Sequence, residues 1–190
     1  MAMCALTAAP ADAQQFKLGR TVLLGGNAMH RAEYQAMIDA AAPFARQADT
    51  VVKFRESNCP GVGKELAACV IASPRFDQPM RFYIPKQLRD PRKYDPLDLR
   101  NTVLHELGHV YDFLYAADGH RGAFMKIFKM RGRFYSDRNA RPPYEKFAVG
   151  YSYCAENLTP QLARKRRKFD FYDYRFTVDQ YFAFCAVLKP

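Results

Sequence analysis

The chain has 190 residues, of which 49% are hydrophobic and 25% charged, a composition typical of one folded domain and not of a disordered or low-complexity protein. Lys and Arg outnumber Asp and Glu by 29 to 19, and the net charge of +10 is compatible with nucleic acid, an anionic surface or an acidic substrate as partner. The sequence contains no apolar run long enough to predict a transmembrane helix.

The first thirteen residues have features of the end of a signal peptide. Ala11-Asp12-Ala13 before Gln14 has the small-x-small form of a cleavage site, and residues 1–10 are small and mildly apolar. A basic n-region and a full apolar stretch are missing. We therefore interpret residues 1–13 as a signal-peptide remnant or a flexible Ala-rich tail, and 14–190 as a single domain. The first interpretation predicts a secreted or periplasmic protein.

The cysteine count agrees with export. Cleavage after Ala13 removes Cys4 and leaves an even number of cysteines, which predicts two disulfides in an exported chain. Of the three pairings that four cysteines allow, we favour the two that link neighbouring elements: Cys59–Cys69 and Cys154–Cys185. The alternative is a cytosolic protein in which these cysteines are reduced and buried.

In chain order, the first half combines one helical pattern with several short β-favouring segments. Apolar spacing predicts a helix over 30–47, which Pro43 kinks or ends. A turn is predicted at 58–63 from its Asn, Pro and Gly residues. The β-favouring segments are 21–24, 51–54, 69–72 and 80–84. We expect a small, antiparallel-rich sheet beside a helix.

The second half is mostly helical. After a Pro-rich connector, the pattern predicts a long helix from about Asp98, a plausible N-cap, to residue 116, with Asp118-Gly119 as its stop. Thr177 is a candidate cap for the last helix. The further helices are expected at 121–130, 143–157 and 178–188. The chain shows no internal repeat, and the predicted fold class is a single α+β domain.

The long predicted helix carries the chemical motif His105-Glu106-Leu107-Gly108-His109, an H-E-x-x-H pattern. Residues four apart lie on one helix face about 6 Å from each other, so both imidazoles can bind one tetrahedral zinc ion. Glu106 lies further round the helix, where it can reach a water on that metal and act as general base.

The rest of the long helix is amphipathic. The side opposite the histidines is apolar and predicts packing on the core, with Val103, Leu107, Val110 and Leu114. Asp112 shares the histidine face. It is either an acceptor for the N–H of a ligand histidine or a carboxylate on the helix surface.

A third ligand must come from another segment. The metzincin spacing is absent, because Asp112 and Tyr115 stand where that class has glycine and histidine. Glu145, early in the helix predicted after Pro142-Pro143, is the favoured candidate. Glu156 and His120 are the alternatives, and a structural role at the helix N-terminus is the other interpretation of Glu145.

With Glu145-Lys-Phe-Ala148 following the histidine motif, the chain resembles the gluzincin zinc metallopeptidases, and most of all their secreted bacterial branch related to anthrax lethal factor. The resemblance covers roughly residues 98–155. It implies a zincin-like fold, one Zn²⁺ per chain held by His105, His109 and Glu145, and Glu106 as general base.

One position departs from that family. The branch often has an oxyanion-stabilising tyrosine seven residues before the ligand glutamate, where this chain has Arg138. Tyr135, Tyr144 and Tyr151 are candidates to replace it.

A second feature is the basic run 164–168, followed by alternating aromatics over 169–176. We favour a solvated loop leading into a β-like segment with its aromatics on the core, over a surface that binds nucleic acid or an anionic polymer.

The sequence thus predicts zinc-dependent hydrolysis of peptide bonds by a secreted, cationic metallopeptidase that is attracted to anionic envelope polymers. Two alternatives are kept. A non-catalytic, secreted envelope-binding protein predicts no zinc and salt-sensitive binding to polyanions. A cytosolic, DNA-associated metalloprotease predicts reduced cysteines and an intact N-terminus.

Overall fold

A computed structural model describes residues 20–41, 49–61, 68–73, 78–93, 96–115, 119–135, 142–156, 169–171 and 174–188. The described elements form an α+β fold around one hydrophobic core, as predicted. They are β1 (Thr21–Leu24), α1 (Ala28–Asp39), β2 (Thr50–Arg55), β3 (Cys69–Ile71), β4 (Arg81–Tyr83), the 3₁₀ helix η1 (Lys86–Arg89), α2 (Pro96–Tyr115), α3 (His120–Ile127), α4 (Pro143–Ala155), β5 (Phe169–Phe171), β6 (Tyr174–Phe176) and α6 (Val178–Val187).

The main sheet has four strands in the order β1-β2-β4-β3. The pairs β1–β2 and β2–β4 are parallel, and only β4–β3 is antiparallel, so the expectation of an antiparallel-rich sheet is wrong. The reason is that α1 connects β1 to β2 and returns the chain to the same end of the sheet, as parallel neighbours require. β3 forms one edge of the sheet.

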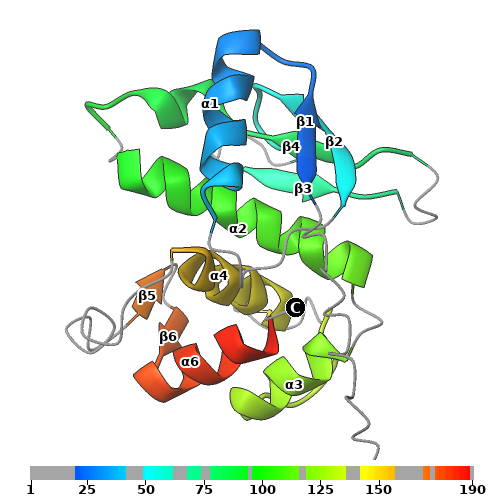
Figure 1. Ribbon diagram of the computed structural model, residues 1–190, viewed down its shortest axis with the longest axis vertical. Helices are drawn as coiled ribbons and strands as arrows, with labels where there is room; N and C mark the ends of the chain where they lie inside the picture. Colours follow the sequence, from blue (N-terminus) through cyan, green and yellow to red (C-terminus); the bar gives the residue numbers. More distant parts are fainter. Residues whose placement is uncertain are drawn as a thin grey trace, which may run out of the picture.

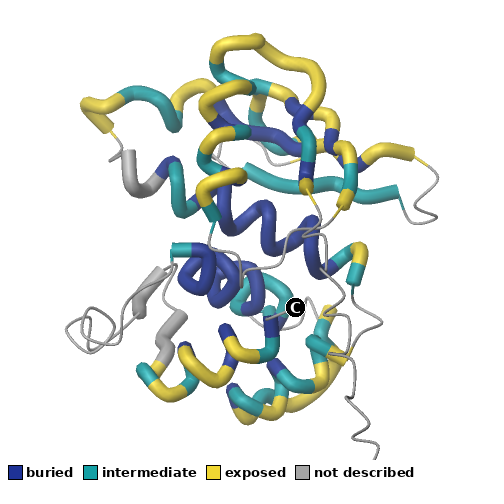
Figure 2. The backbone as a smooth tube through the Cα atoms, in the orientation of Figure 1, coloured by how far each residue is buried: buried dark blue, intermediate teal, exposed yellow. Residues whose placement is uncertain are grey.

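Helix α2 crosses the middle of the molecule, between the sheet with α1 above it and the other helices below it (Figure 1). It contacts α1, β3 and η1 on one side and α4 on the other. Both sides of its middle turns are therefore buried (Figure 2). His105, His109 and Asp112 are therefore buried, whereas Leu114, predicted to pack on the core, is exposed in the last turn.

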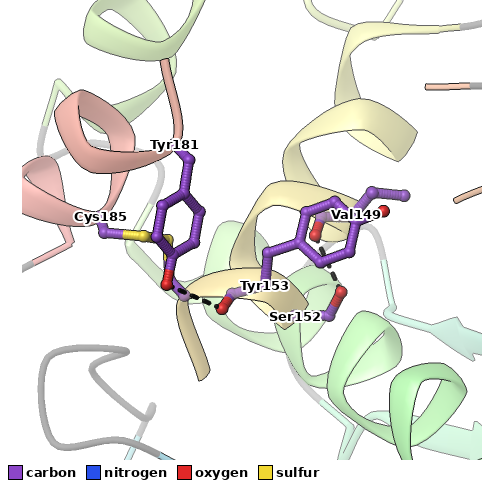
Figure 3. The surroundings of a disulfide bond; sticks show 6 residues. Val149, Ser152, Tyr153, Tyr181 and Cys185 are labelled. Atoms are coloured by element: carbon purple, nitrogen blue, oxygen red, sulfur yellow. Dashed lines mark hydrogen bonds between the residues drawn. A yellow bond between two sulfur atoms is a disulfide. The ribbon is translucent and has the colours of Figure 1, made fainter. Parts of the chain in front are cut away.

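The helical part packs around aromatic side chains. Phe147 of α4 is fully buried, and its ring lies 5.1 to 5.7 Å from those of Phe124, Phe134 and Phe184. The disulfide Cys154–Cys185 joins α4 to α6, and beside it the Tyr181 hydroxyl donates to the carbonyl of Tyr153 (Figure 3). α4 is thereby fixed on two sides, against α2 and against α6.

Several local predictions are confirmed. Both favoured disulfides, Cys59–Cys69 and Cys154–Cys185, are present. Thr177 caps α6 through a capping box with Gln180. β5 and β6 form an antiparallel pair where a β-like segment was expected.

Other predictions are moved or lie outside the described part of the chain. α1 begins at Ala28 and ends at Asp39, earlier than the helix expected over 30–47. α2 begins at Pro96, so Asp98 lies inside its first turn, and the expectation that Asp98 is the N-cap is wrong. The structure does not describe residues 1–13 and 164–168, Pro43, Asp118 and Arg138. Among the described helices, none combines the length and apolar character needed to cross a bilayer.

Candidate metal centre

His105 and His109 project from consecutive turns of α2 and meet Glu145 of α4. The two Nε2 atoms are 3.1 Å apart, and the Glu145 Oε2 atom lies 3.1 Å from the first and 3.5 Å from the second. The donor atoms of the three residues all lie within 4.8 Å of one another. The structure therefore brings together the three ligands that the sequence favoured.

The spacing of these atoms suits a tetrahedral metal ion. Zinc binds histidine nitrogen and carboxylate oxygen at about 2.0–2.2 Å, so tetrahedral ligand atoms lie roughly 3.3–3.5 Å from each other. The three distances in this cluster are close to that range. Two nitrogens and one oxygen are also donors that zinc accepts, and the set leaves a fourth position for water. The residues present fit a metal ion of this kind.

Glycine at position 108 lets the two helices approach closely enough for this meeting. A Cβ atom at Gly108 would lie 2.9 Å from the Ala148 Cα atom and 3.0 Å from the Tyr151 Cβ atom. Ala148 is itself fully buried on the facing side of α4. Gly108 of the H-E-x-x-H motif and Ala148 of α4 thus pack against each other. Their contact brings the first turn of α4, with Glu145, beside the histidines.

The start of α4 is set by proline. Pro142 is the N-cap residue and Pro143 the first residue of the helix, where its fixed φ angle suits a helix and its missing N–H costs nothing. Glu145 therefore stands in the first turn, where the helix dipole favours a carboxylate. The stabilising role and the ligand role are compatible in the same residue.

Charge at the centre is shared between the carboxylate and the imidazoles. Burial opposes ionisation of Glu145, but the hydrogen bonds from His105 and His109 outweigh it and hold the pKa of Glu145 far below its usual value. Burial disfavours the charged form of His109, yet its contact with Glu145 raises its pKa overall. The lowered pKa of Glu145 and the raised pKa of His109 both show that a positive charge is favoured beside the Glu145 carboxylate.

Glu106 is buried beside the ligands on the side of α2 that faces the sheet. It is 4% exposed, and the backbone N–H of Val70 in edge strand β3 donates to its carboxylate. Its Oε2 atom has no hydrogen-bond partner among the described residues. Burial raises the pKa of Glu106, and the neighbouring histidines partly offset this. The edge strand thus helps to position the Glu106 carboxylate, and its Oε2 atom is left able to bind a water molecule or a substrate group.

Asp112 is not an exposed surface carboxylate, because it is buried and paired with Arg121. It is 2% exposed, and the Arg121 guanidinium donates to both of its oxygens, at 2.7 and 3.2 Å. The Tyr135 hydroxyl also donates to it. Burial and this bond raise the pKa of Tyr135, so the phenol keeps its proton. The cluster of Asp112, Arg121 and Tyr135 ties α2 to α3 and to the segment after it.

The three candidate tyrosines lie in different places. Tyr151 is fully buried where α2 meets α4, with its ring 5.6 Å from that of Tyr111. The Tyr144 ring lies 6.0 Å from that of His109, and the Tyr135 ring packs 5.6 Å beyond it. Tyr144 is therefore the candidate that lies beside the metal centre, and Tyr151 belongs to the core.

The two alternative ligands are not part of the group formed by His105, His109 and Glu145. His120 opens α3, and its Nε2 atom lies 3.3 Å from the Tyr111 hydroxyl. Glu156 follows α4 as its C-cap residue, at the opposite end of the helix from Glu145.

Comparisons of the chain with family models, with curated proteins and with solved structures find no match.

Sequence reasoning missed two contributors to the site. The N–H of Val70 acts through the backbone, so its residue type carries no signal. Arg121 carried a weak signal, since a buried acid on the histidine face needs a cation and this arginine comes soon after α2. Its pairing with Asp112 depends on how α3 folds back, which local patterns do not reveal.

Proposed function

We propose that this protein is a zinc-dependent metallopeptidase that hydrolyses peptide bonds. The observation that carries the proposal is the convergence of His105, His109 and Glu145, with the carboxylate of Glu106 buried beside them. An H-E-x-x-H helix with a glutamate ligand from a second helix is also the pattern of the gluzincins, which the sequence resembles. The proposed metal is one Zn²⁺ per chain.

The residues of this site have distinct roles in the proposed reaction. When bound, zinc supplies a Lewis acid that polarises the scissile carbonyl and acidifies a water molecule. Glu106 accepts a proton from that water as it attacks the carbonyl carbon, and then donates the proton to the leaving amine as the C–N bond breaks. The Val70 N–H helps to position the Glu106 carboxylate, whose Oε2 atom has no hydrogen-bond partner among the described residues and is proposed to take the proton.

The same proposal places the protein outside the cytosol. Two disulfides fit an oxidising compartment, and the small-x-small sequence at 11–13 fits an exported chain. Disulfides also disfavour the alternative of a cytosolic, DNA-associated metalloprotease. The charge of +10 supports attraction to anionic envelope polymers, in addition to peptide hydrolysis.

The deciding experiment compares peptide hydrolysis by the zinc-loaded wild type and by Glu106→Gln. The substitution keeps the size of the side chain and removes the base, so we expect a loss of about 10²- to 10⁴-fold in kcat with zinc retained. Glu56→Gln, at a glutamate paired with His30, is the matched control and keeps full activity. Full activity in Glu106→Gln would refute the proposed mechanism. A wild type that binds zinc and cleaves no peptide in a diverse library would refute the activity.

A further inference from the structure

Four lysines and arginines stand in α3 and in the segment between α3 and Tyr135, and the proposed reaction does not use them. We call Lys126, Lys129, Arg131 and Arg133 the basic cluster. All four are exposed, and none forms an ion pair with a described carboxylate. Residues 119–135 contain no Asp or Glu at all, so no acid of this segment neutralises the cluster.

The backbone shows that one of these cations is held against its conformational preference. Lys129 follows the C-cap residue of α3 with a φ of 51°, the left-handed region that usually takes glycine at this place in a helix end. Its neighbour Met130 donates from its N–H to the carbonyl of Met125, which completes the helix end. The helix dipole favours a cation here, but it does not act on Arg131 and Arg133 beyond the helix.

The segment that carries the basic cluster reaches the metal centre at Tyr135, through aromatic contacts. Arg133 stands two residues before Tyr135, whose ring lies against that of Tyr144, and the Tyr144 ring lies beside His109. Arg121 stacks on the Tyr135 ring, 4.5 Å from its centroid, and so fixes this end of the segment. These two ring steps place the Tyr135 ring no more than about 12 Å from that of His109, a length that about four residues of an extended peptide span, and Arg133 is two residues further along the chain.

We propose that the basic cluster binds an acidic segment of the peptide substrate, on the side of the metal centre that Tyr135 and Tyr144 line. This inference rests on the proposed function and names its substrate class: peptides or proteins with glutamates or aspartates a few residues from the cleaved bond. Charge complementarity and continuity with the site support a peptide. A cluster serving a lipid surface or a nucleic acid would not need to join the metal centre.

The test uses the full-length, zinc-loaded protein and a triple variant, Lys129→Gln with Arg131→Gln and Arg133→Gln. The matched control removes the same charge elsewhere: Lys53→Gln, Arg55→Gln and Arg81→Gln, at exposed positions of β2 and β4. The probes are a fluorescein-labelled peptide with a run of glutamates and the same peptide with glutamines. Anisotropy measures binding, and kcat/KM is measured for both peptides.

We expect the triple variant to bind the glutamate peptide about ten-fold more weakly, because each exposed ion pair contributes only modestly and three are lost together. Its kcat/KM falls by a similar factor for that peptide and stays unchanged for the glutamine peptide. The control variant loses much less, and added salt removes the difference. Binding that depends on the cluster without hydrolysis of either peptide would refute the proposed function and leave the acidic-peptide site standing.

Three results would overturn the inference. The first is binding of the glutamate peptide by the triple variant as tight as that of the wild type. Equal losses in the triple and control variants would show an effect of net charge alone. Cluster-dependent binding of anionic phospholipid vesicles or single-stranded DNA, without such binding of the peptide, would assign the cluster to another partner.

Discussion

The two sides of α2 contribute different things to the candidate site. The sheet side supplies a backbone donor, the N–H of Val70, that positions the proposed base Glu106. The helical side supplies Glu145, the third candidate ligand, from α4. The proposed metal binding and the positioning of the proposed base therefore depend on separate packing contacts. The site is a property of α2 held between two parts, and each part can be weakened alone.

Each side also carries one disulfide, and the two differ. Cys154–Cys185 links helices across 31 residues and is almost fully buried. Cys59–Cys69 spans 10 residues and is only half-buried, and Cys69 directly precedes Val70 in β3. The comparison indicates a stabilising role for the first bond and a positioning role for the second.

The largest effect is expected from removing the helical disulfide with Cys154→Ala and Cys185→Ala. Closing a loop of 31 residues restricts the unfolded chain by about 3.7 kcal/mol, and the two lost sulfur atoms leave space in the core. Urea unfolding should show a loss of at least that size. Because α4 is then held less firmly, zinc affinity should fall too. A loss no greater than that of the other disulfide would contradict the comparison.

Removing the sheet disulfide with Cys59→Ala and Cys69→Ala should cost less, about 2.7 kcal/mol for a loop of 10 residues. Its stronger effect falls on catalysis, since β3 is no longer tethered beside Glu106. We expect kcat to drop about ten-fold while zinc stays bound, as measured by steady-state kinetics and metal analysis on the same sample. Zinc loss with unchanged kcat per bound zinc would show that the roles are reversed.

A smaller effect is expected where α2 meets α4. Gly108→Ala places a methyl group against the backbone of Ala148, and relief requires the helices to separate. The strain of overpacking, about 1–3 kcal/mol, exceeds the gain of about 1 kcal/mol that alanine brings to a helix. Thermal unfolding should show net destabilisation by up to about 2 kcal/mol, with weaker zinc binding.

Gly122→Ala in α3 is the matched control for that substitution. Apart from its chain neighbours and the backbone of its own helix, no described atom lies within 4 Å of the added Cβ, so the helix propensity of alanine acts alone. This variant should be stabilised by up to about 1 kcal/mol and bind zinc normally. If both variants change stability in the same direction, the close approach of α2 and α4 does not constrain residue 108.

The smallest effect concerns Lys129. Lys129→Gly relieves the left-handed backbone strain, whereas Lys129→Ala removes the same charge and keeps the strain. We expect the glycine variant to be more stable than the alanine variant by about 1 kcal/mol in urea unfolding. Both should bind the acidic peptide equally, less well than the wild type. Equal stability of the two would show that the backbone here is relaxed.

The sequence predicted most where chemistry and local pattern coincide. The spacing of His105 and His109 on one helix face follows from helix geometry, so this pair could be placed without a structure. The even number of cysteines after residue 13, and a preference for pairs that link neighbouring elements, were enough to pair all four described cysteines. Glu145 was one of several candidates, because no local rule states which distant helix packs against α2.

The sequence failed where distant segments decide the outcome. The parallel pairing of β1 with β2 depends on α1 acting as a crossover, and short β-favouring segments give no sign of direction. The backbone contact of Val70 with Glu106 leaves no trace in residue type. The role of Gly108 became visible only when Ala148 was found against it, although both residues stand within the motifs that the sequence singled out.

The central claim is that His105, His109 and Glu145 together hold one zinc ion, and metal analysis of the purified chain tests it most directly. Native mass spectrometry of the wild type, His109→Ala, Glu145→Ala and Glu156→Ala reports zinc per chain. The account predicts one zinc in the wild type and in Glu156→Ala, and its loss in the other two variants. A wild type without zinc, or Glu145→Ala that keeps a full zinc complement, would contradict it.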